Sequence, residues 1–274
     1  MSYRTWLYSL MLLLSLGCQK ASDATPSGKR LAATNTYLES AAFDLLGRDV
    51  QIIRLAEPGT CPASFDVRPS QVTELQRCRA LLRFDFQKSL DAKVQRDTNT
   101  FQIVEVSMHG GMCDPESYLS ACRQLADSFV SLGWLQRDAA NTKLDAVAER
   151  LKTRAQWARQ LIEQAKLNGR PVLASSHQKA FCEWLGLKVV AAFRPADTAS
   201  IGEIERAIDA GTYNSVKLVI SNLPEGRRTA DALAARLSAK VVVFGNFPEL
   251  KNNQVSFDEM FTANVEALVK AAGS

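Results

Sequence analysis

Histidine is scarce in this sequence of 274 residues, which contains only two. A glycine-rich phosphate loop of the Walker type is missing, which excludes the usual P-loop nucleotide site. A C-x-x-C pair is also missing, which excludes the common short redox or zinc motif although the chain has six cysteines. The net charge of +4 is small for this length and forms no compact basic stripe, so we expect no nucleic-acid partner.

The apolar stretch near the start, residues 10–16, is too short to span a bilayer and has the layout of a secretory signal. It ends in Ser15-Leu16-Gly17-Cys18, which resembles the lipobox of bacterial lipoproteins, whose cysteine is lipidated and becomes the mature N-terminus. An ordinary cleaved signal and an uncleaved anchor are the alternatives. Since all three export the chain, we expect residues 1–18 to be a lipoprotein-type signal and residues 19–30 to be a flexible tether at the membrane surface.

The remaining chain alternates strand and helix patterns, and its 46% hydrophobic residues allow a sizeable core. Residues 31–47 begin as a strand and become a helix, and Pro69-Ser70 opens another helix pattern, in the segment 69–84. Strands are predicted within residues 49–57, 101–107, 171–176, 188–193, 215–223 and 240–247. Helices are predicted within residues 114–134, 177–187, 201–211, 229–239 and 257–272.

A long segment from about residue 141 to 167 has helically spaced apolar residues and contains no proline, so it predicts one long helix. Strands that alternate with helices imply mainly parallel sheets covered by helices. We therefore predict an α/β protein of two lobes, each a mainly parallel sheet flanked by helices. The N-terminal lobe covers residues 31–140, the connecting helix 141–168 and the C-terminal lobe 169–274.

Several segments carry a resemblance to a known family: TNTYL near Thr34, PGTCPASFDVRPS at 58–70, MCDP at 112–115, ASSHQKAFCEWLGLKVV from 174 and ISNLPEGRRTADALAARLSAKVVV from 220. In this order they resemble the periplasmic solute-binding proteins of zinc and manganese ABC transporters. The resemblance covers most of residues 32–270. It implies that one metal ion lies in the cleft between the lobes and is released to a membrane permease. It also implies that the protein catalyses no reaction.

The ligand positions that the resemblance implies are Ala63, Gly110, His177 and Gly245. Only His177 is a retained ligand. Cys61, His109 and Asn246 stand close to the other positions in the sequence.

The residues around these positions predict a site rebuilt with sulfur. His109 and His177 fall at strand-to-helix junctions, one in each lobe, and each is followed by a cysteine within five residues. Imidazole and thiolate ligands suit zinc or cuprous copper. We therefore predict a metal site of His109, His177, Cys61 and Cys113, with zinc as the ion and copper as the second choice. In MHGGMC, residues 108–113, the two glycines allow a tight turn.

The same residues also allow simpler interpretations. The histidines can be satisfied by hydrogen bonds at strand ends, and the two methionines of MHGGMC can be packing residues. In an exported protein Cys113 can form a disulfide with Cys122, while Cys78 and Cys182 look like buried helix residues. Residues 225–228, EGRR, are interpreted as a solvated loop.

The alternative function is a lipoprotein that kept the fold, binds no metal, and recognises another ligand or a protein partner. A thiol enzyme is a third hypothesis, without local support in the sequence.

Overall fold

The structure is a computed structural model that describes residues 30–58, 67–94, 101–252 and 254–273. The predicted signal, the lipidation site Cys18 and all but the last residue of the predicted tether lie outside the described residues, as does the predicted ligand Cys61.

The N-terminal lobe contains a parallel four-stranded sheet with the strand order β2-β1-β3-β4. Its elements are β1 (Arg30–Ala33), α1 (Thr36–Leu46), β2 (Gln51–Arg54), α2 (Pro69–Leu75), β3 (Ala80–Phe84), η1 (Asp85–Leu90), α3 (Asp91–Val94), β4 (Gln102–Val106) and α4 (Pro115–Ser131).

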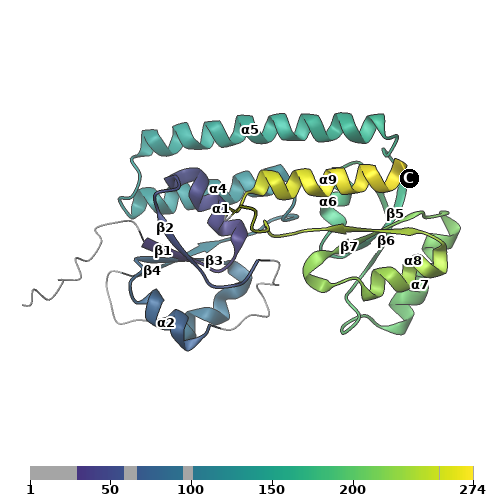
Figure 1. Cartoon of the computed structure of the whole chain (residues 1–274), viewed down its shortest axis with the longest axis horizontal. Helices are drawn as coiled ribbons and strands as arrows, with labels where there is room; N and C mark the ends of the chain where they lie inside the picture. The colour runs from purple at the N-terminus through teal and green to yellow at the C-terminus, as the bar shows by residue number, and fades with distance from the viewer. Residues whose placement is uncertain (1–29, 59–66, 95–100, 253, 274) are drawn as a thin grey trace, which may run out of the picture.

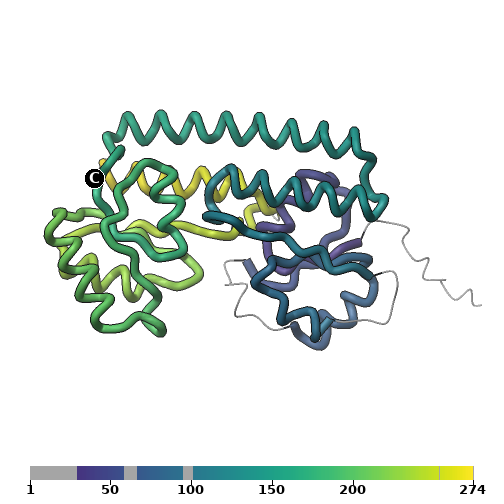
Figure 2. The backbone as a smooth tube through the Cα atoms, turned by 180° about the vertical axis from the view of Figure 1, so that it is seen from behind, coloured from purple at the N-terminus to yellow at the C-terminus, as the bar shows by residue number. Residues whose placement is uncertain are grey.

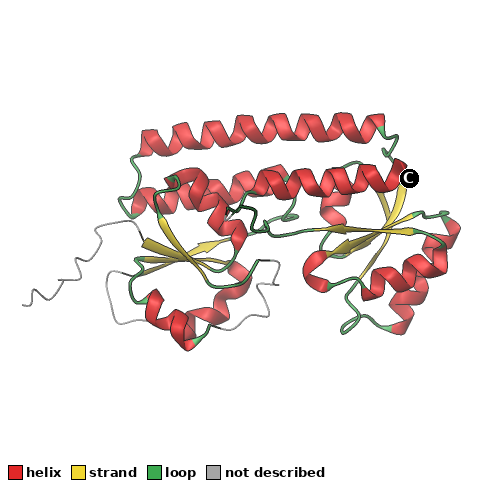
Figure 3. Ribbon diagram, viewed as in Figure 1, coloured by secondary structure: helices red, strands yellow, loops and turns green. Residues whose placement is uncertain are grey.

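The C-terminal lobe repeats this arrangement with the order β6-β5-β7-β8, again fully parallel. Its elements are β5 (Pro171–Ser175), α6 (Lys179–Trp184), β6 (Lys188–Phe193), α7 (Ile201–Tyr213), β7 (Leu218–Asn222), η2 (Leu223–Glu225), α8 (Arg228–Leu237), β8 (Lys240–Phe244) and α9 (Phe257–Gly273). Figure 3 shows helices around both sheets.

The central strands are buried on both faces, as parallel strands between helix layers are expected to be. Every residue of β3, with the sequence ALLRF, is buried, and so is every residue of β7, with the sequence LVISN. The one arginine in β3, Arg83, is held by Asp91 at 2.5 Å and by Glu105 at 2.7 Å, so its charge is paired.

Two helices cross from one lobe to the other (Figures 1 and 2). The long helix α5 (Arg137–Gln164) carries the chain from the N-terminal to the C-terminal lobe. After β8 the chain returns to the N-terminal lobe, and α9 runs back beneath α5 to end beside the C-terminal lobe. The lobes therefore have a second helical connection besides the predicted one.

The first turn of α9 is anchored to the N-terminal lobe. The ring of Phe257 stacks on that of Tyr118 in α4, with ring centroids 4.0 Å apart. The backbone N–H of Phe257 donates to Ser40 Oγ at 3.0 Å, and Ser40 in turn lies 3.0 Å from the hydroxyl of Tyr118. The bond between Phe257 and Ser40 joins residues 217 positions apart, and the three side chains together connect α9 to α1 and α4.

The α5 helix is attached to the same region by charge. Arg150 donates to both carboxylate oxygens of Asp44 in α1, at 3.0 and 2.6 Å, and lies 3.1 Å from the carboxylate of Asp258 in α9. A bidentate arginine–carboxylate pair fixes the orientation of the two side chains as well as their distance. One continuous core of buried apolar residues accordingly includes side chains of both lobes and of α5.

The predicted fold class is confirmed: two lobes with parallel sheets, flanked by helices and joined by a long helix. In the described part of the chain, none of the helices has the length and apolar character needed to cross a membrane.

Candidate functional site

A pocket of about 390 Å³ lies between the lobes, where the carboxyl ends of strands from both sheets face each other. In open parallel sheets this edge is the usual place for ligands. The N-terminal lobe contributes Phe86, Met108, Gly110, Gly111 and Met112. The C-terminal lobe contributes Ser176, His177, Ala180, Asn222, Pro224, Glu225, Asn246 and Phe247.

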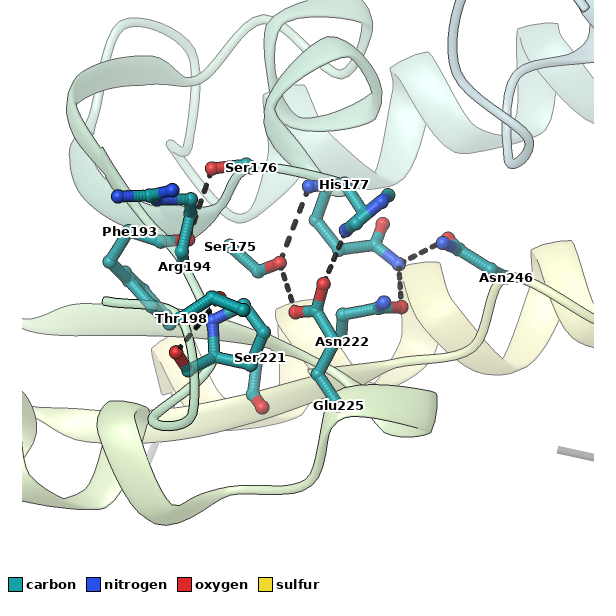
Figure 4. A network of polar contacts seen from close by, with 12 residues as sticks. Ser175, Ser176, His177, Phe193, Arg194, Thr198, Ser221, Asn222, Glu225 and Asn246 are labelled. Carbon is teal, nitrogen blue, oxygen red and sulfur yellow. Dashed lines mark hydrogen bonds and ion pairs between the residues drawn. The ribbon is translucent and has the colours of Figure 1, made fainter. Parts of the chain in front are cut away.

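The polar centre of this pocket is the pair His177 and Glu225 (Figure 4). His177 follows β5, and its Nδ1 hydrogen-bonds with a carboxylate oxygen of Glu225, which ends the 3-10 turn after β7. The other carboxylate oxygen of Glu225 accepts from Ser175 Oγ at 2.6 Å. The Glu225 side chain is 11% exposed and that of His177 is 65% exposed, so the imidazole projects outward from a largely buried carboxylate.

The pair shifts both pKa values in the direction of an ion pair. The hydrogen bond to Glu225 raises the pKa of His177 above its usual value, although partial burial opposes this. Burial would raise the pKa of Glu225, but hydrogen bonds from His177 and Ser175 outweigh it and lower that pKa. Glu225 is therefore a fixed negative charge behind the imidazole.

Glu225 corrects one prediction from the sequence. Residues 225–228 were expected to form a solvated loop, but Glu225 turns inward and contacts His177. In the sequence Glu225 stands in the charged segment EGRR, which is typical of a solvated loop, so its contact with His177 was not predicted. The available signal was position: Glu225 stands just after a predicted strand, at the same sheet edge as His177.

The loop MHGGMC, residues 108–113, reaches the C-terminal lobe. Gly110 has φ +120°, and a Cβ there would lie 2.8 Å from Ser117 Oγ, so a larger residue would be strained. A Cβ on Gly111 would lie 3.2 Å from Cβ of Ala180 in α6, so this glycine permits close approach of the lobes. Gly110 is thus explained by its backbone conformation and Gly111 by the lack of space for a side chain.

His109 lies in this loop with its side chain exposed. Its neighbours Met108 and Gly110 line the pocket, whereas His109 is not among the lining residues. The structure therefore places His109 beside the pocket and brings His177 into it.

Cys113 is buried at the contact between the lobes. Its Sγ lies 3.0 Å from the carbonyl oxygen of Gly245, 3.2 Å from Asn246 Oδ1 and 3.5 Å from Gln178 Oε1. These acceptors belong to the C-terminal lobe. Burial raises the pKa of Cys113 far above its usual value, although the contact with Gln178 opposes this, so the thiol is protonated. In this conformation Cys113 behaves as a hydrogen-bond donor across the lobes.

Amide side chains complete this contact. Gln178 Nε2 donates to Asn222 Oδ1 at 3.0 Å and to Asn246 Oδ1 at 2.5 Å. Asn264 in α9 exchanges two hydrogen bonds with the backbone of Gly245. Gly245 and Asn246, which the family resemblance relates to a ligand position, are thus held within the C-terminal lobe by these amides and contact the N-terminal lobe through Cys113.

Cys113, Cys122 and Cys182 are free thiols, so the suggested disulfide between Cys113 and Cys122 is wrong. Four described cysteines are buried: Cys78, Cys113, Cys122 and Cys182. Cys182 lies in α6 as expected, whereas Cys78 lies in the turn after α2.

Among the residues that the structure describes, no three histidine, cysteine, aspartate or glutamate side chains gather closely enough to hold a metal ion. Cys61 lies outside those residues. Of the predicted ligands, the structure thus places His177 in the pocket, His109 beside it and Cys113 in the lobe contact.

A pocket between two parallel sheets, spanned by a long helix, defines a two-lobed solute-binding protein. The chain belongs to the family of the periplasmic component A of zinc-uptake complexes, ZnuA, whose sequence profile matches residues 31–271.

Solved structures agree with this assignment at the level of the fold. A crystal structure of ZnuA matches with a TM-score of 0.72 and 14% identity, covering 89% of this chain and 99% of the other. A zinc-bound deletion mutant of ZnuA matches at 0.73 with 15% identity over 89% and 98%. The Mn-bound periplasmic metal-binding protein of Candidatus Liberibacter asiaticus matches at 0.76 with 12% identity over 89% and 99%. No curated protein matches the chain.

Proposed function

We propose that this chain captures a transition-metal ion in the pocket between its lobes and delivers it to the permease of an ABC importer, without catalysis. Membership of the zinc-uptake family supports metal capture as the general role. Zinc is the ion we favour, and cuprous copper is the second choice, because an imidazole is the principal donor available.

The observation that carries this proposal is the arrangement of His177 on Glu225. A histidine that binds a metal almost always gives its other ring nitrogen to a carboxylate or carbonyl group, which fixes the ring and its tautomer. Here Glu225 engages Nδ1, so Nε2 is left as the nitrogen for a metal. Ser175 holds the carboxylate in place from behind.

The proposed donors from the N-terminal lobe are His109, exposed beside the pocket, and Cys61, from the segment that the sequence resemblance relates to a ligand position. Cys113 is the weakest member of the predicted set. Its thiol would reach an ion only after the MHGGMC loop leaves Gly245 and Asn246. With α5 and α9 both crossing the lobes, we expect only a small closing motion on binding.

We also propose export to the periplasmic side of the membrane and a lipid anchor at Cys18. Both rest on the signal-like pattern of residues 1–18. The anchor would hold the folded lobes near the membrane permease.

The test is metal content by mass spectrometry, followed by zinc titration, on the form that begins after Cys18. We expect near-stoichiometric metal in the wild type and its loss in His177→Ala. Glu225→Gln should weaken zinc binding by about 10- to 100-fold, because the carboxylate orients the ligand. Glu203→Gln is the matched control: this glutamate pairs with Arg194 elsewhere in the same lobe and should leave binding unchanged.

A second candidate is a binding protein for a ligand other than a metal. The observation in its favour is the small number of gathered donors among the described residues. An absence of metal in every preparation, even after addition of zinc and cuprous copper, would contradict the first proposal and favour this one.

A further inference from the structure

The pocket is larger than a site for a bare metal ion needs to be, and it has few side chains that could serve as metal ligands. Zinc takes four ligands at roughly 2.0–2.3 Å, so a complete protein site is compact. This pocket measures about 390 Å³, which is within the range of sites for small organic molecules. Among its described lining residues, His177 and Glu225 are the histidine and the carboxylate, and both Glu225 oxygens already have partners.

The wall contributed by the N-terminal lobe is apolar. Phe86 is 49% exposed, and its ring stacks on that of the buried Phe84, with centroids 5.1 Å apart and an interplanar angle of 22°. The stacking holds the ring in a defined orientation at the pocket. Met108 and Met112 lie on the same wall, and thioethers make favourable contacts with aromatic ligands.

These two walls together indicate the class of ligand. We propose that the pocket takes the metal ion as a complex with a small organic chelator that has a planar, apolar part. His177 Nε2 completes the coordination of the ion, while the plane of the chelator packs on Phe86 and the two thioethers. This inference rests on the proposed function, because it assigns the remaining donors of the same ion to the chelator.

The charge of the pocket narrows the chelator further. Glu225 places a carboxylate directly behind His177, where its two oxygens are held by His177 and by Ser175 and its side chain is 11% exposed. A strongly anionic chelator would be repelled by it. An uncharged chelator fits this pocket, and nitrogen donors, which zinc accepts, provide one.

The test compares three probes on the form that begins after Cys18: zinc alone, the 1:1 complex of zinc with 2,2′-bipyridine, and bipyridine alone. Native mass spectrometry gives the bound species and calorimetry gives the affinities. We expect the complex to bind about tenfold more tightly than zinc alone, since one aromatic stacking contact is worth up to about that factor.

Variants of Phe86 test whether its ring is the source of the higher affinity for the complex. Phe86→Ala should lower the ratio of the two affinities, that of the complex over that of zinc alone, from about ten to about one, whereas Phe86→Tyr, which keeps the ring, should retain the ratio. Tyr213→Ala is the control, because this tyrosine is 88% exposed at the end of α7. His177→Ala should lose both zinc and the complex.

Each contrary result has a separate meaning. Equal affinities for zinc and the complex, or an advantage that survives Phe86→Ala, would overturn this inference while leaving a His177-dependent zinc site intact. Binding of bipyridine alone as tightly as the complex would overturn it as well, because the metal would then be unnecessary. Binding of none of the three probes would overturn both this inference and the proposed function.

Discussion

After the first strand of each sheet, the two lobes place different side chains. Asn35 follows β1 and is 2% exposed, with its Oδ1 accepting from the backbone N–H groups of Tyr37 and Leu38 at 3.1 and 3.0 Å. His177 follows β5 and projects into the pocket. The two sheets have the same strand order, so topology brings both residues to the same kind of edge.

The difference shows how one architecture separates stability from binding. In the N-terminal lobe the polar residues at this edge are used inside the fold: Asn35 caps α1, and Thr34 donates to Gln87 at 2.7 Å. In the C-terminal lobe the chain of Ser175, Glu225 and His177 ends at the pocket. The N-terminal lobe therefore offers an apolar wall and the C-terminal lobe a polar centre.

The largest effect is expected from Phe257→Ala, which breaks the attachment of α9 to the N-terminal lobe. Phe257 is 1% exposed and stacks on Tyr118. Removal of a buried phenyl ring leaves a cavity and should lower the free energy of unfolding by about 3–5 kcal/mol. Urea unfolding, monitored by circular dichroism, measures this change in the free energy of unfolding. Tyr213→Ala, an exposed position, should change it by less than about 0.5 kcal/mol.

A loss below about 1 kcal/mol in Phe257→Ala would show that this attachment of α9 contributes little to stability. The connection between the lobes would then rest on α5 and the shared core.

Cys113→Ala is the next test, because this thiol is the contact of the N-terminal lobe with Gly245 and Asn246. We expect a loss of about 1–2 kcal/mol from the lost hydrogen bond and the small cavity. Cys113→Ser, which keeps a donor, should recover part of the loss. Zinc titration of the same variants gives the second readout. Lost zinc binding at unchanged stability would instead identify Cys113 as a ligand.

The architecture was predictable because the alternation of strand and helix patterns along the chain does not depend on the exact limits of any one element. The apolar spacing of the connecting segment predicted a helix at 141–168, and α5 covers Arg137–Gln164. The strand β3 was not separated from the preceding helix pattern. Its five residues, ALLRF, follow that helix without a glycine or proline, so only pairing with β1 and β4 distinguishes it as a strand.

The site was less predictable because its contacts join distant residues. The family resemblance and the position after a strand both pointed to His177, but Glu225, 48 residues away, looked like part of a charged loop. Cys113 appeared suited to a metal because it is near His109 in sequence. Its surroundings come instead from Gly245 and Asn246, more than 130 positions away. Burial of this kind is a tertiary property that spacing does not encode.

Asn35→Ala tests the structural use of the N-terminal edge. The side chain satisfies two N–H groups at the start of α1, so its loss should cost about 1–2 kcal/mol. Asn35→Asp, which keeps the accepting oxygen, should cost less. Urea unfolding of both variants provides the measurement, with zinc affinity expected to stay unchanged. Equal stability of Asn35→Ala and the wild type would contradict the assignment of Asn35 to the fold.

His177→Ala tests the opposite edge and should have the smallest effect on stability. The imidazole is 65% exposed, so its ion pair with Glu225 is screened by solvent and is worth less than about 1 kcal/mol in the absence of metal. Loss of zinc binding with little loss of stability would separate the role of His177 from that of Asn35. A stability loss as large as that of Asn35→Ala would mean that His177 is also part of the fold.

The difference in the free energy of unfolding between the wild type and His177→Ala should depend on pH, in a direction that the two pKa shifts determine. The hydrogen bond to Glu225 raises the pKa of His177 in the folded state, so its contribution is fully present below the unfolded pKa of about 6.5 and is lost as the pH rises through the folded value. The lowered pKa of Glu225 makes the carboxylate contribution present above about pH 4.3. Wild type and His177→Ala, unfolded in urea with a chelator present, should therefore differ most near pH 5–6. A difference that grows from pH 6 to pH 8 would contradict the ion pair, because the neutral imidazole would then be the stabilising form.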